Sequence, residues 1–172
     1  MTHGNSIKHK VYLKYGGGEL RLSDCRDVVK RAVNETLRSE AVDIVCVINV
    51  LVTNDKGILK YNREFRNIDS KTDVLSFPMQ EFKHAGFCGC IDLEIDEDTG
   101  FLPLGDIVVS SESVIKQAPL YENTVMQEMA YLLIHSTLHL LGYDHANKAD
   151  ELIMHKKNKA IMQEMELYIN DK

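Results

Sequence analysis

The sequence predicts an α/β fold of the α+β-like kind: a single domain, residues 1–172, with a small mixed four-stranded sheet and about five surrounding helices. A chain of 172 residues has the length of one domain with a continuous core. Short β-branched segments alternate with segments of helical spacing. No convincing helix separates the strand-like segments 72–78 and 105–110, which favours an antiparallel pair joined by a long loop.

Four segments have the residue pattern of strands. Residues 10–15 alternate between polar and apolar side chains, as a half-buried strand does. Residues 42–52 are β-branched and almost continuously apolar, which predicts a central strand covered on both faces. The segment 72–78 ends at Pro78, where a missing N–H costs least, and residues 105–110 form the fourth strand.

Five segments have helical spacing. They cover about residues 23–39, 55–65, 110–119, 123–141 and 149–168. Ser23 is the expected N-cap of the first helix. The 123–141 helix is apolar nearly all round, so we expect it in the middle of the domain. The last helix is expected to pack behind the site, with Leu152, Ile153, Ala160, Ile161 and Met165 facing inward and Lys156, Lys157 and Lys159 facing outward.

Composition limits the partners of the protein. The net charge is −6 and the isoelectric point about 5.6, so a nucleic-acid contact needs a local basic patch. The first residues lack the basic, then apolar, then small-residue pattern of a signal sequence, so none is expected, and the longest apolar run, residues 44–52, is too short to span a bilayer. With four cysteines and a lone Cys88-x-Cys90, we expect reduced thiols, a cytoplasmic location and no membrane partner.

The sequence motif richest in chemistry is His135-Ser-Thr-Leu-His139-Leu-Leu-Gly142-Tyr-Asp-His145. Two histidines four apart share a helix face, and the glycine lets the chain leave the helix and return a third imidazole. Three converging imidazoles make a metal site with an open position. The spacing is that of metzincin peptidases, but Ser136 replaces the glutamate that serves them as general base.

Other residues near this motif allow more than one interpretation. Asp144 either orients an imidazole or acts on a bound water, or it is an ordinary turn residue. The acidic segment 92–98 either binds a hard cation or is a solvated loop. The histidines without such company are expected on the surface: His3, His9, His84 and His155.

A basic cluster lies at the end of the second helix. Arg63 and Arg66 are three residues apart, with Lys60 and Lys71 nearby. A guanidinium fork can hold two phosphate oxygens, which suits a phosphodiester better than a peptide. On composition alone, the cluster is an ordinary solvated helix end.

Four blocks together resemble the YbeY family of bacterial endoribonucleases that mature ribosomal RNA. The blocks are Asn62-Arg-Glu-Phe-Arg66, Thr72-Asp-Val-Leu-Ser-Phe-Pro78, Leu104-Gly-Asp-Ile-Val-Val109 and His135 to His145. The resemblance implies a single α/β domain, one zinc-type metal held by His135, His139 and His145, and a functionally required arginine at Arg66. Ser136 stands where many members have glycine, and Lys71 where many have proline.

The resulting hypothesis is a metal-dependent, single-strand-specific endoribonuclease that acts in 16S ribosomal RNA 3′-end maturation and in ribosome quality control. Arg66 stabilises charge on the phosphorus, and Arg63 and Lys71 are expected to bind substrate. Its partners are an rRNA precursor and, as candidates, the ribosomal subunit or its proteins, with no DNA expected. The base is a hydroxide held by the metal, an acid such as Asp144 or Asp106, or the RNA's own 2′-hydroxyl.

Two alternatives remain at this point. A zinc peptidase fits the metzincin-like ligand spacing but lacks its glutamate. A non-catalytic ribosome-assembly factor with a structural metal is the other. Three imidazoles also suit nickel or copper, so the sequence does not identify the metal.

Overall fold

The computed structural model describes residues 7–89 and 92–167, and within them four strands form one mixed sheet. The strands are β1 (Lys10–Tyr15), β2 (Cys46–Thr53), β3 (Val74–Pro78) and β4 (Leu102–Ser110), in the order β1-β2-β4-β3. The β1–β2 and β2–β4 pairs are parallel, and β3 pairs with β4 antiparallel at the sheet edge. The predicted four-stranded sheet, its central 42–52 segment and the antiparallel pair are confirmed.

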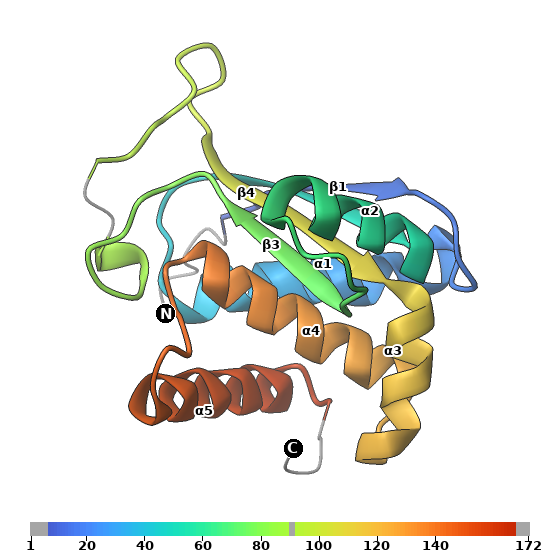
Figure 1. Cartoon of the computed structure of the whole chain (residues 1–172). Helices are drawn as coiled ribbons and strands as arrows, with labels where there is room; N and C mark the ends of the chain where they lie inside the picture. Colours follow the sequence, from blue (N-terminus) through green and yellow to red (C-terminus); the bar gives the residue numbers. More distant parts are fainter. Residues whose placement is uncertain (1–6, 90–91, 168–172) are drawn as a thin grey trace.

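The predicted five helices are also confirmed, in two layers around the sheet (Figure 1). They are α1 (Leu22–Ser39), α2 (Asp55–Arg66), α3 (Ser111–Gln117), α4 (Val125–Leu140) and α5 (Lys148–Glu164), with short 3-10 turns η1 (Phe87–Gly89) and η2 (Ala118–Tyr121). One face of the sheet carries α2, and α1 and α4 cover the other, with α5 beyond α4. The main core lies between the sheet, α1 and α4, so α4 is the central helix that its apolar surface predicts.

Several element boundaries differ from the predicted ones. Strand β2 begins at Cys46 rather than at residue 42, β3 at Val74 rather than at residue 72, and β4 at Leu102 rather than at residue 105. Helix α1 begins at Leu22, with Arg21 rather than Ser23 at the N-cap. The physical reason is that the Asp24 carboxylate accepts the Arg21 N–H at 3.2 Å and so satisfies the helix start two residues earlier than predicted.

His9 is buried, which contradicts its predicted surface position. Its Nδ1 accepts a hydrogen bond from the Cys46 N–H at 3.2 Å, where the chain enters β2. Burial lowers the pKa of His9, so the ring is neutral and able to accept this bond at neutral pH. His9 therefore completes the backbone pairing at the start of the sheet.

The predicted inner face of α5 is partly wrong. Ile161 and Met165 are buried as predicted, but Leu152 is 52% exposed, Ile153 47% exposed, and Ala160 is exposed as well. Met154 and Asn158 are buried instead. Lys157 is not a solvated outer residue, because its Nζ lies 2.6 Å from a buried carboxylate of Glu40 beyond the end of α1. In the first half of α5 the buried stripe is thus rotated from the one that hydrophobicity predicts.

The start of α2 is fixed by Asp55. Its carboxylate accepts hydrogen bonds from the Ser110 and Ser113 hydroxyls at 2.6 and 2.8 Å, and from two lysines. Burial raises the pKa of Asp55, but these four hydrogen bonds outweigh it and hold the pKa well below its usual range. Because Ser110 ends β4 and Ser113 lies in the first turn of α3, Asp55 sets where α2 runs, and hence where Arg66 at its far end lies.

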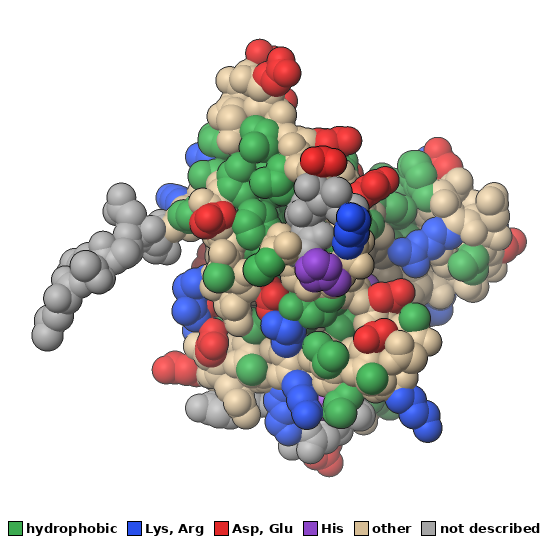
Figure 2. Space-filling model, turned by 90° about the vertical axis from the view of Figure 1, so that its left-hand side faces the viewer, with side chains coloured by type: hydrophobic (Ala, Val, Ile, Leu, Met, Phe, Trp, Pro, Cys, Tyr) green, Lys and Arg blue, Asp and Glu red, His purple; other side chains and the backbone are tan. Residues whose placement is uncertain are grey.

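The segment between β3 and β4 rises away from the sheet (Figure 1). Figure 2 shows hydrophobic side chains gathered on this face, below a tip that carries acidic ones. In the tip, the Asp96 carboxylate accepts from both the N–H and the hydroxyl of Thr99, so it closes a local turn. Among the described residues, the carboxylates of 92–98 do not gather into a metal-ligand cluster. Of the Cys88-x-Cys90 pair, Cys90 lies outside the described residues.

Within residues 7–89 and 92–167, no helix is both long and apolar enough to cross a membrane.

Candidate metal centre and substrate groove

The turn after α4 brings the third histidine back to the helix. The Gly142 N–H bonds the His139 carbonyl at 3.0 Å, and the Tyr143 N–H bonds the Leu138 carbonyl at 3.1 Å, which is a Schellman ending. Gly142 has φ +83, and a Cβ there would lie 2.5 Å from the Phe82 Cβ, so both conformation and space require glycine. The chain then reverses toward the groove, as the sequence predicted.

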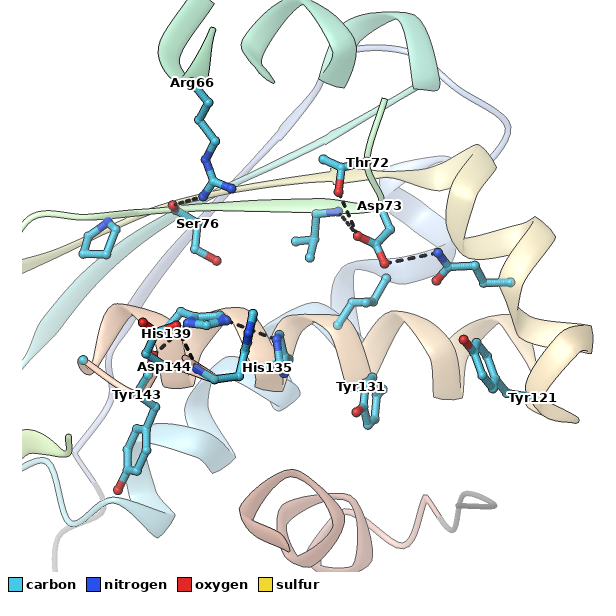
Figure 3. Close-up of a pocket in the computed structure, with 16 residues that line it drawn as sticks. Arg66, Thr72, Asp73, Ser76, Tyr121, Tyr131, His135, His139, Tyr143 and Asp144 are labelled. Atoms are coloured by element: carbon cyan, nitrogen blue, oxygen red, sulfur yellow. Dashed lines mark hydrogen bonds between the residues drawn. The ribbon is translucent and has the colours of Figure 1, made fainter. Parts of the chain in front are cut away.

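The three predicted ligands converge (Figure 3). One nitrogen from each of His135, His139 and His145 lies within 4.8 Å of the others, and the first two Nε2 atoms are 3.1 Å apart. Tetrahedral zinc with Zn–N bonds of about 2.0–2.1 Å places its ligand nitrogens roughly 3.3 Å apart. The cluster therefore fits such an ion after small side-chain adjustments.

The protonation of His139 follows from its neighbour. Its Nδ1 lies 2.7 Å from the Tyr143 carbonyl oxygen, and since a carbonyl only accepts, Nδ1 carries the hydrogen. Burial lowers the pKa of His139, although the bond to Tyr143 opposes this effect. The ring is thus neutral at neutral pH and turns the Nε2 lone pair toward the other histidines, as a metal ligand requires.

Tyr143 is itself anchored from two distant helices. Its hydroxyl donates to Glu40 Oε2 at 2.7 Å, and Lys157 Nζ donates to Glu40 Oε1 at 2.6 Å. The Glu40 side chain is only 5% exposed, so this chain of bonds is sheltered from water. Sequence reasoning missed this support. Tyr143 lies inside the histidine block, but nothing local marks a glutamate 103 residues away.

Asp144 lies on the groove, and its Oδ1 accepts the His145 N–H at 2.8 Å. This contact is of the kind that a turn residue makes, and the carbonyl of Tyr143, not Asp144, contacts the imidazole of His139. Action of Asp144 on a bound water stays a prediction. Ser136 is fully buried, and its hydroxyl has no hydrogen-bond partner among the described residues. It faces the core, so it does not take the place of the peptidase glutamate.

A groove of about 730 Å³ runs between β3 and α4 past the histidines. It is lined by Arg66, Thr72, Asp73, Val74, Ser76, Pro78, Gln117, Tyr121, Tyr131, Leu132, His135, His139, Gly142, Tyr143, Asp144 and His145. Arg66 reaches it from the end of α2, over the edge strand, where its Nη2 donates to the Ser76 carbonyl at 3.2 Å (Figure 3). Burial is the main cause of the lowered pKa of His139, and the positive charge of Arg66 lowers it further.

The other predicted site residues lie elsewhere. Arg63 Nη2 lies 2.5 Å from Asp69, Lys71 Nζ lies 2.5 Å from Asp55, and neither lines the groove. Their role in substrate binding stays a prediction. Asp106 accepts a hydrogen bond from a side chain of β2 at 2.8 Å. It lies two residues before Val108, which packs with α2, so its side chain is on the sheet face opposite α4 and the histidines.

Sequence reasoning also missed part of the groove wall. Thr72 and Asp73 lie inside a block that the family resemblance marked, but no role was assigned to them. Tyr131 precedes His135 by four residues, and helical spacing places it on the same face of α4. Gln117 and Tyr121 carry no local signal, because only the packing of α3 and η2 brings them to the groove.

The fold and site define the class as a small α/β domain with a candidate three-histidine metal centre facing an arginine. Residues 15–166 match the sequence model of a family described as "Endoribonuclease YbeY". Since this match covers most of the chain, the chain belongs to the YbeY endoribonuclease family, and the predicted family is confirmed.

Individual relatives agree. The chain is 39% identical over 145 residues to the endoribonuclease YbeY of Clostridium kluyveri, covering 81% of this chain and 88% of that protein. It is 37% identical over 164 residues to that of Clostridium botulinum strain Langeland, covering 92% and 99%. The solution structure of TM1509 from Thermotoga maritima matches with a TM-score of 0.54 and 26% identity over 91% of each chain.

Proposed function

We propose that the chain is a metal-dependent endoribonuclease that cleaves single-stranded RNA in the maturation of ribosomal RNA, including the 16S 3′ end, and in ribosome quality control. Membership of the YbeY endoribonuclease family supports the reaction class. The observation that carries the proposal is that His135, His139, His145 and Arg66 line one groove. Three imidazole ligands and a guanidinium on opposite walls suit a phosphodiester.

His135, His139 and His145 would hold one zinc ion, and zinc bound there supplies Lewis-acid polarisation of a phosphoryl oxygen. The Nη2 of Arg66 donates a hydrogen bond to the Ser76 carbonyl. That contact fixes the plane of the guanidinium, whose other N–H groups can donate to phosphate oxygens and stabilise the charge that develops during cleavage.

The geometry reduces the number of candidates for the general base of the reaction. Asp106 lies on the wrong face of the sheet, and Ser136 is buried. Of the two acidic residues that line the groove, Asp73 has its oxygens engaged by the Val74 N–H and a glutamine amide. Asp144 is therefore the acidic candidate, beside the RNA's own 2′-hydroxyl. Cyclic phosphate ends on the product indicate the 2′-hydroxyl, and 5′-phosphate ends indicate attack by water.

The edge of β3 argues against a peptide substrate. The backbones of Asp73 and Met79 bond β4, so by alternation the backbone groups of residues 74, 76 and 78 point to the free edge. A peptide that adds to an edge strand needs these groups. Arg66 already occupies the Ser76 carbonyl, and Pro78 has no N–H to offer. The Ser76 carbonyl and the Pro78 nitrogen are thus not available to pair with a peptide strand.

We also propose an rRNA precursor as the substrate, ribosomal subunits and their proteins as partners, and a cytoplasmic location, since rRNA is made and matured there in bacteria. No DNA or membrane partner is included. The free thiols of Cys25, Cys46 and Cys88 are consistent with a reducing compartment.

The test compares cleavage of single-stranded RNA, duplex RNA and an unfolded polypeptide by the zinc-loaded protein. We expect only single-stranded RNA to be cut, with activity lost in His139→Ala and lowered about 10²–10³-fold in Arg66→Ala. Lys56→Ala, which removes an exposed charge from the first turn of the same helix and lies outside the groove, is the control and should stay near wild type. Polypeptide cleavage that disappears in His139→Ala would show that the protein is a peptidase instead.

A further inference from the structure

The candidate metal centre has a second hollow on its other side. This hollow, of about 670 Å³, shares Tyr131, His135 and His145 with the groove, and α5 completes it. The residues that α5 contributes are Lys148, Glu151, Leu152, Met154 and His155. In Figure 3, Arg66 and Ser76 lie on one side of α4, and Tyr131 projects on the opposite side, toward α5. The histidine cluster therefore lies between the β3–α4 groove and this second hollow.

The α5 wall of the hollow is one helix face. Lys148, Glu151, Leu152 and His155 follow the spacing i, i+3, i+4 and i+7, so they project together over two turns. Leu152 is 52% exposed there, although the neighbouring stripe of α5 is buried. The Asn158 amide donates to the Tyr131 carbonyl at 3.2 Å and ties α5 to α4 just beyond the hollow. The wall is thus held in place and combines a cation with apolar surface.

An endonuclease cuts inside a chain, so nucleotides must be accommodated on both sides of the phosphate at its reactive centre. The β3–α4 groove, which carries Arg66, is the site for the nucleotides on one of these sides. The second hollow begins at the same histidines, and its volume is within the roughly 300–1,000 Å³ that encloses a small organic molecule. Because the hollow and the groove meet at His135 and His145, an RNA strand that passes the candidate metal centre in the groove enters the hollow directly.

We propose that this α4–α5 hollow is a second RNA subsite, which holds the nucleotides on the far side of the scissile phosphate from the β3–α4 groove; the inference rests on the proposed function. Lys148 lies where a phosphate follows the scissile one, and the protein's net charge of −6 makes such a local cation necessary; the His155 ring beside it can donate a hydrogen bond. Leu152 and the Tyr131 ring offer apolar and aromatic surface to a base. Glu151 can accept from a ribose hydroxyl or a base amino group.

The chain offers matched pairs of variants for the test. Lys148→Glu reverses the charge in the hollow, and Lys156→Glu makes the same change on an exposed part of α5 that does not line it. Leu152→Ser removes apolar surface from the hollow, and Ile153→Ser does so at the next residue, which is 47% exposed and outside it. Melting temperature and zinc affinity are measured for all four, to show that fold and metal centre are intact.

Each variant is assayed on a single-stranded RNA with one mapped cleavage site, and on two truncated RNAs that keep one nucleotide beyond the site on either its 5′ or its 3′ side. For the full RNA, we expect Lys148→Glu to raise KM about tenfold and Leu152→Ser about threefold, and the two controls less than twofold. On the truncated RNA that lacks the nucleotides expected in the hollow, the variants and wild type should have the same KM. On the truncated RNA that keeps these nucleotides, the differences in KM should persist.

Three results overturn the proposal. In the first, Lys148→Glu behaves like Lys156→Glu on every RNA. In the second, its effect is the same on both truncated RNAs, which would mean long-range charge rather than a subsite. In the third, the zinc-loaded wild type cuts none of the RNAs, which refutes the proposed function itself and with it the subsite. The first two leave wild-type cleavage intact, so the failures are distinguishable.

Discussion

Replacing Tyr143 with phenylalanine removes a single hydroxyl and leaves the ring and the backbone of the metal-centre turn in place. The hydroxyl donates to Glu40 at 2.7 Å, and the Glu40 side chain is only 5% exposed. A hydrogen bond to a charged, buried acceptor contributes about 1.5–3 kcal/mol. Lys157 still pairs with Glu40 in the variant, so we expect a loss near 2 kcal/mol, which lowers Tm by about 4–8 °C in a domain of this size.

The same change should weaken metal binding. The Tyr143 carbonyl holds His139 at Nδ1, and loss of a partner of this kind typically costs about 10–100-fold in metal affinity. Since Tyr143→Phe removes the anchor of the carbonyl and not the carbonyl itself, we expect about tenfold weaker zinc binding, measured by competition with a chelating dye. Tyr15→Phe is the control, because the Tyr15 hydroxyl also donates one bond of 2.7 Å, to Gly18 at an exposed site. Unchanged zinc affinity in Tyr143→Phe, with a lower Tm, would refute the link to His139.

Three further predictions concern the fold and the metal. Chelation should abolish RNA cleavage and leave the circular dichroism spectrum largely unchanged, because the histidines lie outside the main core; unfolding on chelation would favour a structural metal. Asp55→Asn should cost about 1–3 kcal/mol at pH 7 in urea unfolding. Because the folded pKa of Asp55 is depressed, its contribution is present above the unfolded pKa near 3.8 and is lost as pH falls below it, so the variant's stability should vary less with pH there. Gly142→Ala should lower both Tm and zinc affinity, since φ is +83 and the new Cβ meets Phe82, by about 1–2 kcal/mol or more in stability.

The sequence predicted the site best where its geometry is local. His135 and His139 share a face because an α-helix has a fixed period, and Gly142 ends the helix because it adopts positive φ. The strand and helix segments were also predictable, because the spacing of their apolar residues repeats with the period of each structure. His145 follows from the same short stretch.

The sequence pattern gave wrong predictions of burial where polar residues are buried or apolar residues are exposed. In α5 the buried positions include Asn158, whereas Leu152 and Ile153 are exposed, so hydrophobic spacing predicted the wrong face for the first half of this helix and the right one for Ile161. His9 was predicted on the surface because imidazoles usually lie there, yet the entry of β2 supplies it with a backbone partner. In both cases a contact distant in sequence decides whether a polar group can be buried.

By itself, the sequence determined the family, the α/β class and the three histidines that the turn after α4 brings together. Only the tertiary structure decided the rest of the site. The place of β3 at the sheet edge lets Arg66 reach over to the histidines, and the alternation of β4 turns Asp106 away from them. The anchoring of Tyr143 by Glu40 likewise joins residues 103 apart. Helix and turn geometry act over a few residues, whereas these contacts depend on how whole elements pack.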